Sequence, residues 1–269
     1  NRRLKTKSNQ MRKGPSFHLP ALRGLVFEMI EIKALASSSK GNCYRVTDGK
    51  TQLLLECGIP FKEIQKGLGF KVSEIAGCLI SHEHQDHCKA VAEIIRAGIE
   101  TYMSFGTIEL LELKEKGLCG HRVNVLKSKQ QFTIGTWTVL PFDVSHDSVE
   151  PLGFLLSNQV GEKLLYATDT YYLKYRFQGL THIMLEVNYS LDILKNNVKN
   201  GLVDPVLKNR TLRSHMNLEN AKELLKANDL SKVQQIWLLH LSEKNSDEKR
   251  FKREIMELTG KPTFIAGAN

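Results

Sequence analysis

The chain has 269 residues and is long enough to bury the core of one large α/β domain or two small ones. Its formal net charge of +9 suggests a polyanionic partner, but residues 1–28 hold seven cations and one acidic residue, which leaves only +3 for the rest of the chain. No apolar run approaches membrane-spanning length and no secretion signal is visible, so a membrane protein is excluded and a cytoplasmic one is expected.

The first 28 residues have the composition of a flexible basic leader. They combine many cations with Pro15, Pro20 and few apolar runs. Such a segment either binds nucleic acid or is incidental to function. We expect residues 29–269 to form a single folded domain.

The cysteines indicate reduced thiols. They are odd in number and form no Cys-x-x-Cys pair, which does not fit a disulfide framework. The five are Cys43, Cys57, Cys78, Cys88 and Cys119.

The folded part is expected to begin with a strand at 30–36 and a hairpin of strands 42–47 and 51–55 around the turn residues 48–50. The loop at 37–42 is rich in hydroxyls and backbone donors, so it is either a phosphate-binding loop or a plain turn. Glu56 follows the second hairpin strand. It is either a surface residue or a carboxylate that orients metal-bound histidines.

The most informative stretch is SHEHQDH at residues 81–87, which follows an apolar strand and precedes a helical pattern. His82 and His84 can leave an extended segment on one side, whereas Asp86 and His87 lie at the helix start. A lone histidine is usually an ordinary residue. Three imidazoles and a carboxylate in six residues instead favour one segment that serves two ions of zinc, manganese or iron.

Periodicity predicts two packed sheets with helices outside both. From residue 61 the predicted elements first alternate between helix and strand, the elements between 131 and 168 are all strands, and the elements after 182 alternate between strand and helix again. The predicted helices are 61–67, 88–97, 106–116, 217–227 and 247–258, the last capped by Ser246. The further predicted strands are 77–81, 100–104, 122–126, 131–134, 136–142, 152–157, 163–168, 182–187 and 234–241.

Three later polar residues follow or end apolar strands: His146, Asp169 and His240. Each alone could be a satisfied core residue. The four donors of the 82–87 cluster cannot complete two ions, however, so these three residues are candidates for the missing ligands.

The ordered blocks of the chain resemble the YycJ/WalJ-type subfamily of metallo-β-lactamase-fold hydrolases, which is associated with DNA 5′-exonuclease activity. The blocks are residues 36–42, 54–58, 81–87, 144–147, 151–153, 167–169, 186–188, 214–217 and 239–245. The resemblance implies an α/β fold, a four-layer αββα sandwich, with a dinuclear metal site at one edge.

The resemblance also implies roles for individual residues. The first metal position takes His82, His84 and His146, the second takes Asp86, His87 and His240, and Asp169 bridges them. Asp86, Asp169 and His215 are the implied catalytic residues, with His215 near the leaving group or a substrate phosphate. Glu56 is expected to orient a motif histidine, and the expected substrate contacts are Ser39, Lys40, Asn42, Arg213 and His215.

The expected activity is phosphodiester hydrolysis on DNA from 5′ ends, in which two divalent ions activate a bridging water as hydroxide. Zinc or manganese is preferred and iron is a third choice. The basic segment 190–214, broken by Gly201 and Pro205, is either a mobile lid over a polyanion or a solvated loop. Residues 171–177 either stack on unpaired bases or pack as a helix.

Other functions compete with this one. Small-molecule ester, lactone or thioester hydrolysis uses related sites, and a ribonuclease is an alternative because nothing in the sequence reads a 2′-hydroxyl. A non-catalytic nucleic-acid-binding protein is disfavoured by the complete set of ligands. The sequence carries no indication of an oligomeric state.

Overall fold

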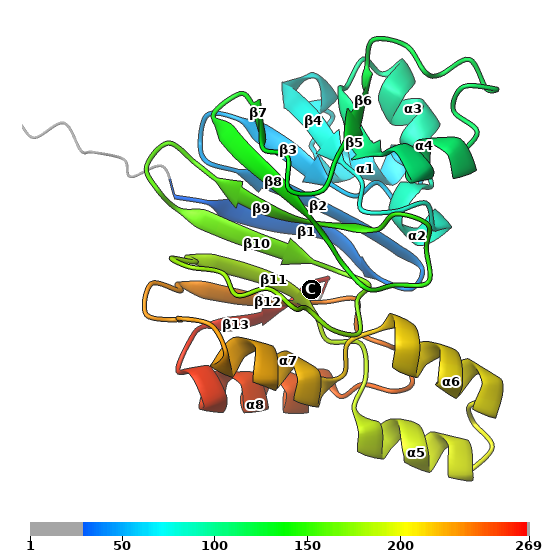
Figure 1. The fold of residues 1–269 in the computed structure, drawn as a ribbon, viewed down its shortest axis with the longest axis vertical. Helices are drawn as coiled ribbons and strands as arrows, with labels where there is room; N and C mark the ends of the chain where they lie inside the picture. The colour runs from blue at the N-terminus through cyan, green and yellow to red at the C-terminus, as the bar shows by residue number, and fades with distance from the viewer. Residues whose placement is uncertain (1–28, 268–269) are drawn as a thin grey trace, which may run out of the picture.

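A computed structural model describes residues 29–267, so the basic leader predicted for residues 1–28 lies outside the described residues. Two sheets pack face to face and helices cover the outer face of each (Figure 1). This is the four-layer αββα sandwich that the sequence predicted.

The first sheet has six strands in chain order. Its first three strands form an antiparallel meander and the last three continue in parallel. The predicted hairpin turn is present: the Asp48 carboxylate accepts hydrogen bonds from the backbone N–H groups of Lys50 and Thr51. The strands are β1 (Glu31–Ser38), β2 (Gly41–Thr47), β3 (Gln52–Leu55), β4 (Ile75–Leu79), β5 (Thr101–Ser104) and β6 (Val123–Leu126).

The second sheet has seven strands, again in chain order, antiparallel from β7 to β10 and parallel from β10 to β13. Its last strand was not predicted, because it has three residues and, unlike β7 of the same length, no tight turn joins it to a longer strand. The strands are β7 (Phe132–Ile134), β8 (Trp137–Asp143), β9 (Leu152–Ser157), β10 (Lys163–Ala167), β11 (His182–Glu186), β12 (Gln235–Leu239) and β13 (Thr263–Ile265).

The helix predicted at 61–67 is confirmed, but the other two helices predicted beside the first sheet are shorter than expected. The helix expected at 88–97 is two pieces, because the backbone N–H of Ala90 donates to Cys57 O at 2.9 Å instead of continuing the first piece. The helix expected to reach residue 116 ends at Leu110, and Glu112 then adopts a left-handed φ of 51°. This layer contains α1 (Phe61–Gly67), the 3₁₀ turn Val72–Glu74, α2 (Gln85–Cys88), α3 (Val91–Arg96) and α4 (Phe105–Leu110).

The second sheet is covered by α7 (Leu218–Lys226) and α8 (Glu248–Thr259) (Figure 1). The predicted cap of α8 was wrong by one residue. The carboxylate of Asp247, not the hydroxyl of Ser246, accepts the hydrogen bond from Arg250 N, and Ser246 instead donates to Ser242 O.

The segment 190–214 is not irregular, as its Gly and Pro suggested, but contains helices α5 (Leu191–Lys199) and α6 (Pro205–Ser214). Gly201 lies in the turn between them. Pro205 occupies the first helical position of α6, where its missing N–H costs nothing, and Asp204 caps that end by accepting from Val206 N at 2.6 Å. The two helices lie beside α7 at one end of the molecule (Figure 1).

The main core lies between the sheets. Trp137 is completely buried there and donates its indole N–H to Thr51 O, and Tyr44, Phe154 and Tyr166 pack around the same layer. No helix within residues 29–267 is long and apolar enough to cross a membrane. The sandwich leaves the carboxyl ends of several strands at one edge, and the candidate site lies there.

Candidate metal centre

The candidate ligands lie at the carboxyl ends of strands from both sheets. His82 and His84 follow β4, while His146, Asp169 and His240 follow β8, β10 and β12 in turn. Strands β8, β10 and β12 run in the same direction, so their ends meet at one edge. The structure therefore brings together residues that are up to 158 positions apart in the sequence.

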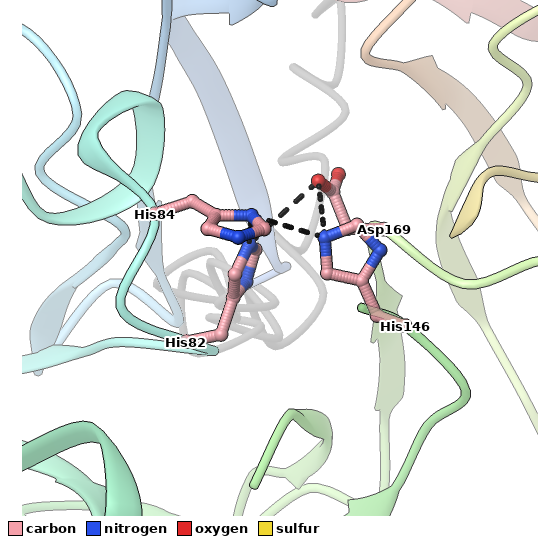
Figure 2. A group of neighbouring side chains, drawn as sticks. All are labelled: His82, His84, His146 and Asp169. Carbon is pink, nitrogen blue, oxygen red and sulfur yellow. Dashed lines mark hydrogen bonds and ion pairs between the residues drawn. The ribbon is translucent and has the colours of Figure 1, made fainter. Parts of the chain in front are cut away.

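The first group of donors comprises His82, His84, His146 and Asp169 (Figure 2). The Nδ1 atom of His84 lies 3.1 Å from Nε2 of His82 and 3.1 Å from Nε2 of His146. The Oδ2 atom of Asp169 lies 3.4 Å from His146 Nε2 and 3.7 Å from His82 Nε2. Figure 2 shows the four side chains pointing toward one another, with His82 and His84 on one segment and His146 and Asp169 on two others.

The second group comprises Asp86, His87, His240 and again Asp169. The Oδ2 atom of Asp86 lies 3.4 Å from His87 Nε2 and 3.2 Å from His240 Nε2. Asp169 Oδ2 lies 3.4 Å from His87 Nε2. Within each group the ligand atoms all lie within 4.8 Å of one another.

Asp169 is the residue shared by both groups, and its backbone is unusual. Its φ is +44°, and His240 and Glu56 also have left-handed φ values of 52° and 65°. Such conformations cost energy for residues other than glycine and concentrate at functional sites. Three of the six described non-glycine residues with positive φ therefore belong to this one site or its support.

The structure adds Glu186, for which the sequence reasoning assigned no role. Glu186 is the last residue of β11 and is completely buried. Its Oε1 lies 2.6 Å from His215 Nδ1 and 3.2 Å from His240 Nδ1, and its Oε2 accepts from the backbone N–H groups of Thr170 and Met216. The signal that could have identified it is a carboxylate ending an apolar strand, the same signal that singled out Glu56.

Glu56 is also completely buried and faces the second group from behind. Its carboxylate accepts from Ser81 N and from the hydroxyl of Tyr166, and its Oε1 lies 3.7 Å from His87 Nδ1. That ring nitrogen is buried and has no hydrogen-bond partner among the described residues. A small ring shift would let His87 donate to Glu56 and leave Nε2 facing the other ligands.

Burial favours the neutral form of two histidines of the first group, His82 and His146. Burial lowers the pKa of His82 well below its usual value and lowers that of His146, and the attraction of the Asp169 carboxylate does not reverse this. The Nδ1 of His146 faces the carbonyl oxygen of Ser214 at 2.8 Å, and this neighbour makes Nδ1 the protonated nitrogen. His146 Nε2 is thereby left with its lone pair toward the group, as a metal ligand requires.

The second group is dominated by negative charge. Burial opposes ionisation of Asp86, but hydrogen bonds from His240 and His87 hold its pKa below the usual range. Burial likewise opposes a charge on His240, yet the nearby carboxylates of Asp169, Asp86 and Glu186 raise its pKa to about 10. Several buried carboxylates converge on imidazole nitrogens, and a divalent cation would satisfy both kinds of donor. The residues therefore fit a divalent-metal centre.

The half-buried His215 and the completely buried Glu186 form an acid–base pair beside both groups. Burial lowers the pKa of His215, but the Glu186 carboxylate outweighs it and the net shift is upward. The His215 ring lies 5.4 Å, between centroids, from those of both His146 and His240. It thus lies between the ligands of the two groups.

The proposed substrate contacts are placed differently from one another. Asn42 is completely buried, and its amide nitrogen donates to Asp86 O at 3.2 Å, so it faces the metal group rather than solvent. Ser39 and Lys40 are exposed at the β1–β2 turn, where Lys40 pairs with Glu243 at 2.5 Å. Arg213 is exposed in the last turn of α6.

Helix α6 contacts the loop of His146 at two points. Besides the contact with Ser214 O, the neighbouring Asp147 pairs through Oδ2 with Arg210 Nε at 2.7 Å. Asp147 Oδ1 lies 3.3 Å from His146 Nε2, so this carboxylate, to which the sequence reasoning assigned no role, also borders the first group. The basic helix and the metal centre are therefore in direct contact.

Comparison with known proteins gives a consistent result. The profile of the β-lactamase superfamily domain matches residues 57–241. The chain is 25% identical over 256 residues to the exodeoxyribonuclease YycJ of Bacillus anthracis, covering 88% of this chain and 92% of that protein. It is 28% identical over 224 residues to the exodeoxyribonuclease WalJ of Streptococcus pneumoniae serotype 2, covering 79% and 81%.

Among solved structures, the metallo-β-lactamase-fold protein YhfI of Bacillus subtilis superposes with a TM-score of 0.65 at 16% identity. The match covers 88% of this chain and 96% of that one. At this identity the likeness concerns the fold alone.

Proposed function

The chain belongs to the β-lactamase superfamily and is a metal-dependent hydrolase, and we propose that it cleaves phosphodiester bonds in DNA as a 5′-to-3′ exonuclease. The observation that carries the proposal is the sharing of Asp169 by two complete groups of donors. Sites with two metal positions about 3.5–4 Å apart are typical of enzymes that displace groups at phosphorus.

Two divalent ions are proposed, zinc or manganese first and iron third, because imidazole with carboxylate suits all of these metals. The first would be held by His82, His84 and His146, the second by Asp86, His87 and His240, and Asp169 would contact both. When bound, such ions polarise a phosphoryl oxygen and make water a nucleophile at neutral pH. Glu56 would keep His87 oriented toward the second ion.

His215 is proposed to protonate the departing sugar oxygen. Its Nδ1 is committed to Glu186 at 2.6 Å, so the imidazole proton on Nε2 remains for the substrate. Glu186 fixes the ring tautomer and stabilises the imidazolium, and its second oxygen is anchored by the backbone of Thr170 and Met216. His215 and Glu186 would thus act as a rigid acid pair on the leaving-group side.

The substrate class follows from the charges around the centre. Lys40 lies at the β1–β2 turn, and α6, which carries Lys208, Arg210 and Arg213, contacts the loop of His146 through Ser214 and Arg210. A polyanionic backbone suits this border better than a neutral lactone or thioester does. DNA is proposed ahead of RNA because the two relatives YycJ and WalJ are named exodeoxyribonucleases. The direction of digestion is proposed from the resemblance to their subfamily.

The proposal is tested by digesting matched linear DNA labelled at the 5′ or the 3′ end, covalently closed circular DNA, and an RNA of the same sequence, each with Mn²⁺ or Zn²⁺. We expect early release of 5′-terminal label and no cutting of the closed circle. Equal cutting of circles and linear strands would refute the exonuclease. Hydrolysis of lactones or thioesters without any cleavage of DNA would refute the nuclease altogether.

A further inference from the structure

A chain of hydrogen bonds behind the second donor group connects two of its ligands through residues that the proposed reaction does not use. The backbone N–H of His240 donates to Ser37 Oγ at 2.9 Å, and Ser37 Oγ lies 2.7 Å from the hydroxyl of Tyr44. The Tyr44 hydroxyl donates to Asn42 Oδ1 at 3.1 Å. The amide nitrogen of Asn42 then donates to the backbone oxygen of Asp86 at 3.2 Å and faces its Oδ2 at 3.4 Å.

The direction of this chain is determined by its members. The Asn42 amide nitrogen faces the backbone oxygens of Ser38 and Asp86, the Oδ2 of Asp86 and the Nε2 of His87, all of which can accept, so its oxygen faces Tyr44. Because Tyr44 has one proton and gives it to that oxygen, Ser37 must donate to Tyr44. Ser37 in turn accepts from His240 N–H. Every bond therefore points the same way, from His240 toward Asp86, and aligned bonds of this kind strengthen one another.

This chain of hydrogen bonds also connects the two sheets of the sandwich. Ser37, Asn42 and Tyr44 lie on the paired strands β1 and β2 of the first sheet, whereas His240 follows β12 of the second. Asn42 and Tyr44 are completely buried, so water cannot replace a lost partner. The Oδ2 of Asp86 and the Nε2 of His240, which are 3.2 Å apart, thus depend on a common support that His82, His84 and His146 do not touch.

We infer that Ser37, Tyr44 and Asn42 are positioning residues for the second metal position, holding Asp86 and His240 at the separation that this ion requires. Tyr44 is the central link because its hydroxyl both accepts and donates. The inference rests on the proposed two-metal function, but it concerns metal occupancy rather than the nucleic-acid substrate.

The test is a titration of the metal-free, full-length protein with Mn²⁺, in which calorimetry counts the ions bound and electron paramagnetic resonance detects coupling between them. We expect two ions and a coupled signal in the wild type. In Tyr44→Phe we expect the affinity of one ion to fall about 10- to 100-fold, with the other unchanged and the coupled signal lost at equal Mn²⁺.

The matched control is Tyr189→Phe, which removes another completely buried tyrosine hydroxyl, one that accepts from Asn217 Nδ2 at 3.5 Å away from the ligands. It should bind both ions like the wild type. Ser37→Ala should reproduce the loss and Ser37→Thr, which keeps a hydroxyl, should restore the second ion. If Tyr44→Phe does not fold, the comparison of Ser37→Ala with Ser37→Thr tests the positioning role instead.

Two results would overturn the inference: unchanged affinity for both ions in Tyr44→Phe and Ser37→Ala, or an equal fall for both. A wild-type protein that binds a single ion would overturn it as well. If two ions bind and respond as expected but no DNA is cleaved, the proposed function fails and the positioning role stands.

Discussion

Gly58 lies directly against the backbone of Asp86. A Cβ atom added to Gly58 would lie 1.7 Å from the carbonyl oxygen of Asp86 and 2.7 Å from the backbone nitrogen of His87. Real Cβ atoms do not approach backbone so closely, and backbone cannot rotate away as a flexible side chain can. The absence of a side chain at Gly58 is what allows α2, with two ligands of the second group, to sit against the end of β3.

Gly58→Ala should therefore displace Asp86 and His87 and weaken the second metal position. We expect at least about a 10-fold loss of affinity for one ion, the scale at which disturbed ligand support is felt, with a matching fall in hydrolysis. The control is Gly120→Ala, where an added Cβ meets nothing within 4 Å. Metal analysis of both variants checks this, and full occupancy of both positions in Gly58→Ala would contradict it.

His215→Ala should slow the cleavage of DNA by about 100- to 10,000-fold, the usual contribution of a general acid. Bis(p-nitrophenyl) phosphate has a leaving group that needs no proton, so its hydrolysis should fall far less. The comparison of kcat for the two substrates at equal metal occupancy isolates proton donation. Equal losses on both substrates would show that His215 supports the metals instead.

Arg213→Ala and Lys40→Ala should raise the DNA concentration needed for half-maximal rate and reduce the slope of log affinity against log salt by about 1 each. Lys40 pairs with Glu243, so its substitution also leaves that carboxylate unpaired and adds repulsion of the phosphate backbone to the lost attraction. Lys252→Ala, an exposed cation on α8, is the control. Salt-dependent binding to a labelled oligonucleotide measures the slopes, and unchanged slopes would remove both residues from the DNA path.

The buried His182 should make the fold sensitive to mild acid. Burial lowers its pKa from the ordinary 6.5 to about 4, so between these values the unfolded chain binds a proton that the folded chain does not. The contribution of the neutral His182 to the stability of the fold is fully present above pH 6.5 and is lost as the pH falls toward 4. The shift corresponds to about 3 kcal/mol of unfolding free energy.

His182→Phe should remove this dependence. Urea unfolding of the metal-free wild type and variant at several pH values would show their stabilities converging, or crossing, as the pH falls from 6.5 to 4. Two curves that stay parallel over that window would mean that His182 is not the titrating group.

Much of the fold and site could be predicted because the relevant signals are local. The alternating residues of 42–47 and 51–55, on either side of the turn at Asp48, form the hairpin of β2 and β3. The polar residues at later strand ends could be assigned to the site because the four donors of the 82–87 cluster are too few for two metal ions. The single helix expected at 88–97 failed because a tertiary contact interrupts it, and the helix expected at 106–116 ends early, shortly before the left-handed residue Glu112. A carbonyl oxygen from residue 57 captures Ala90 N–H, which no periodicity could reveal.

The parts that escaped prediction depend on which distant groups face each other. Glu186 looks like any carboxylate at the end of a strand until His215 and His240 are placed beside it. Helices α5 and α6 were missed because they bury few apolar residues, packing Leu194 and Val203 in a small cluster of their own rather than on the main core. The amphipathic pattern is weak in α6; it is clear in α5, but the nearby Gly201 and Pro205 indicated an irregular segment.

The most direct test of the central claim is Asp169→Ala, assayed on 5′-labelled linear DNA with saturating Mn²⁺ beside Asp143→Ala. Asp143 is a carboxylate at the end of β8, two strands away from β10 in the same sheet; it pairs with Lys129 and lies outside both donor groups. Since Asp169 alone belongs to both groups, we expect cleavage to fall by at least about 1000-fold, equivalent to about 4 kcal/mol. DNA affinity should stay within about 3-fold, because no phosphate contact is removed, and Asp143→Ala should digest DNA at the wild-type rate. Near-normal cleavage by Asp169→Ala would contradict a hydrolytic centre built on the shared carboxylate.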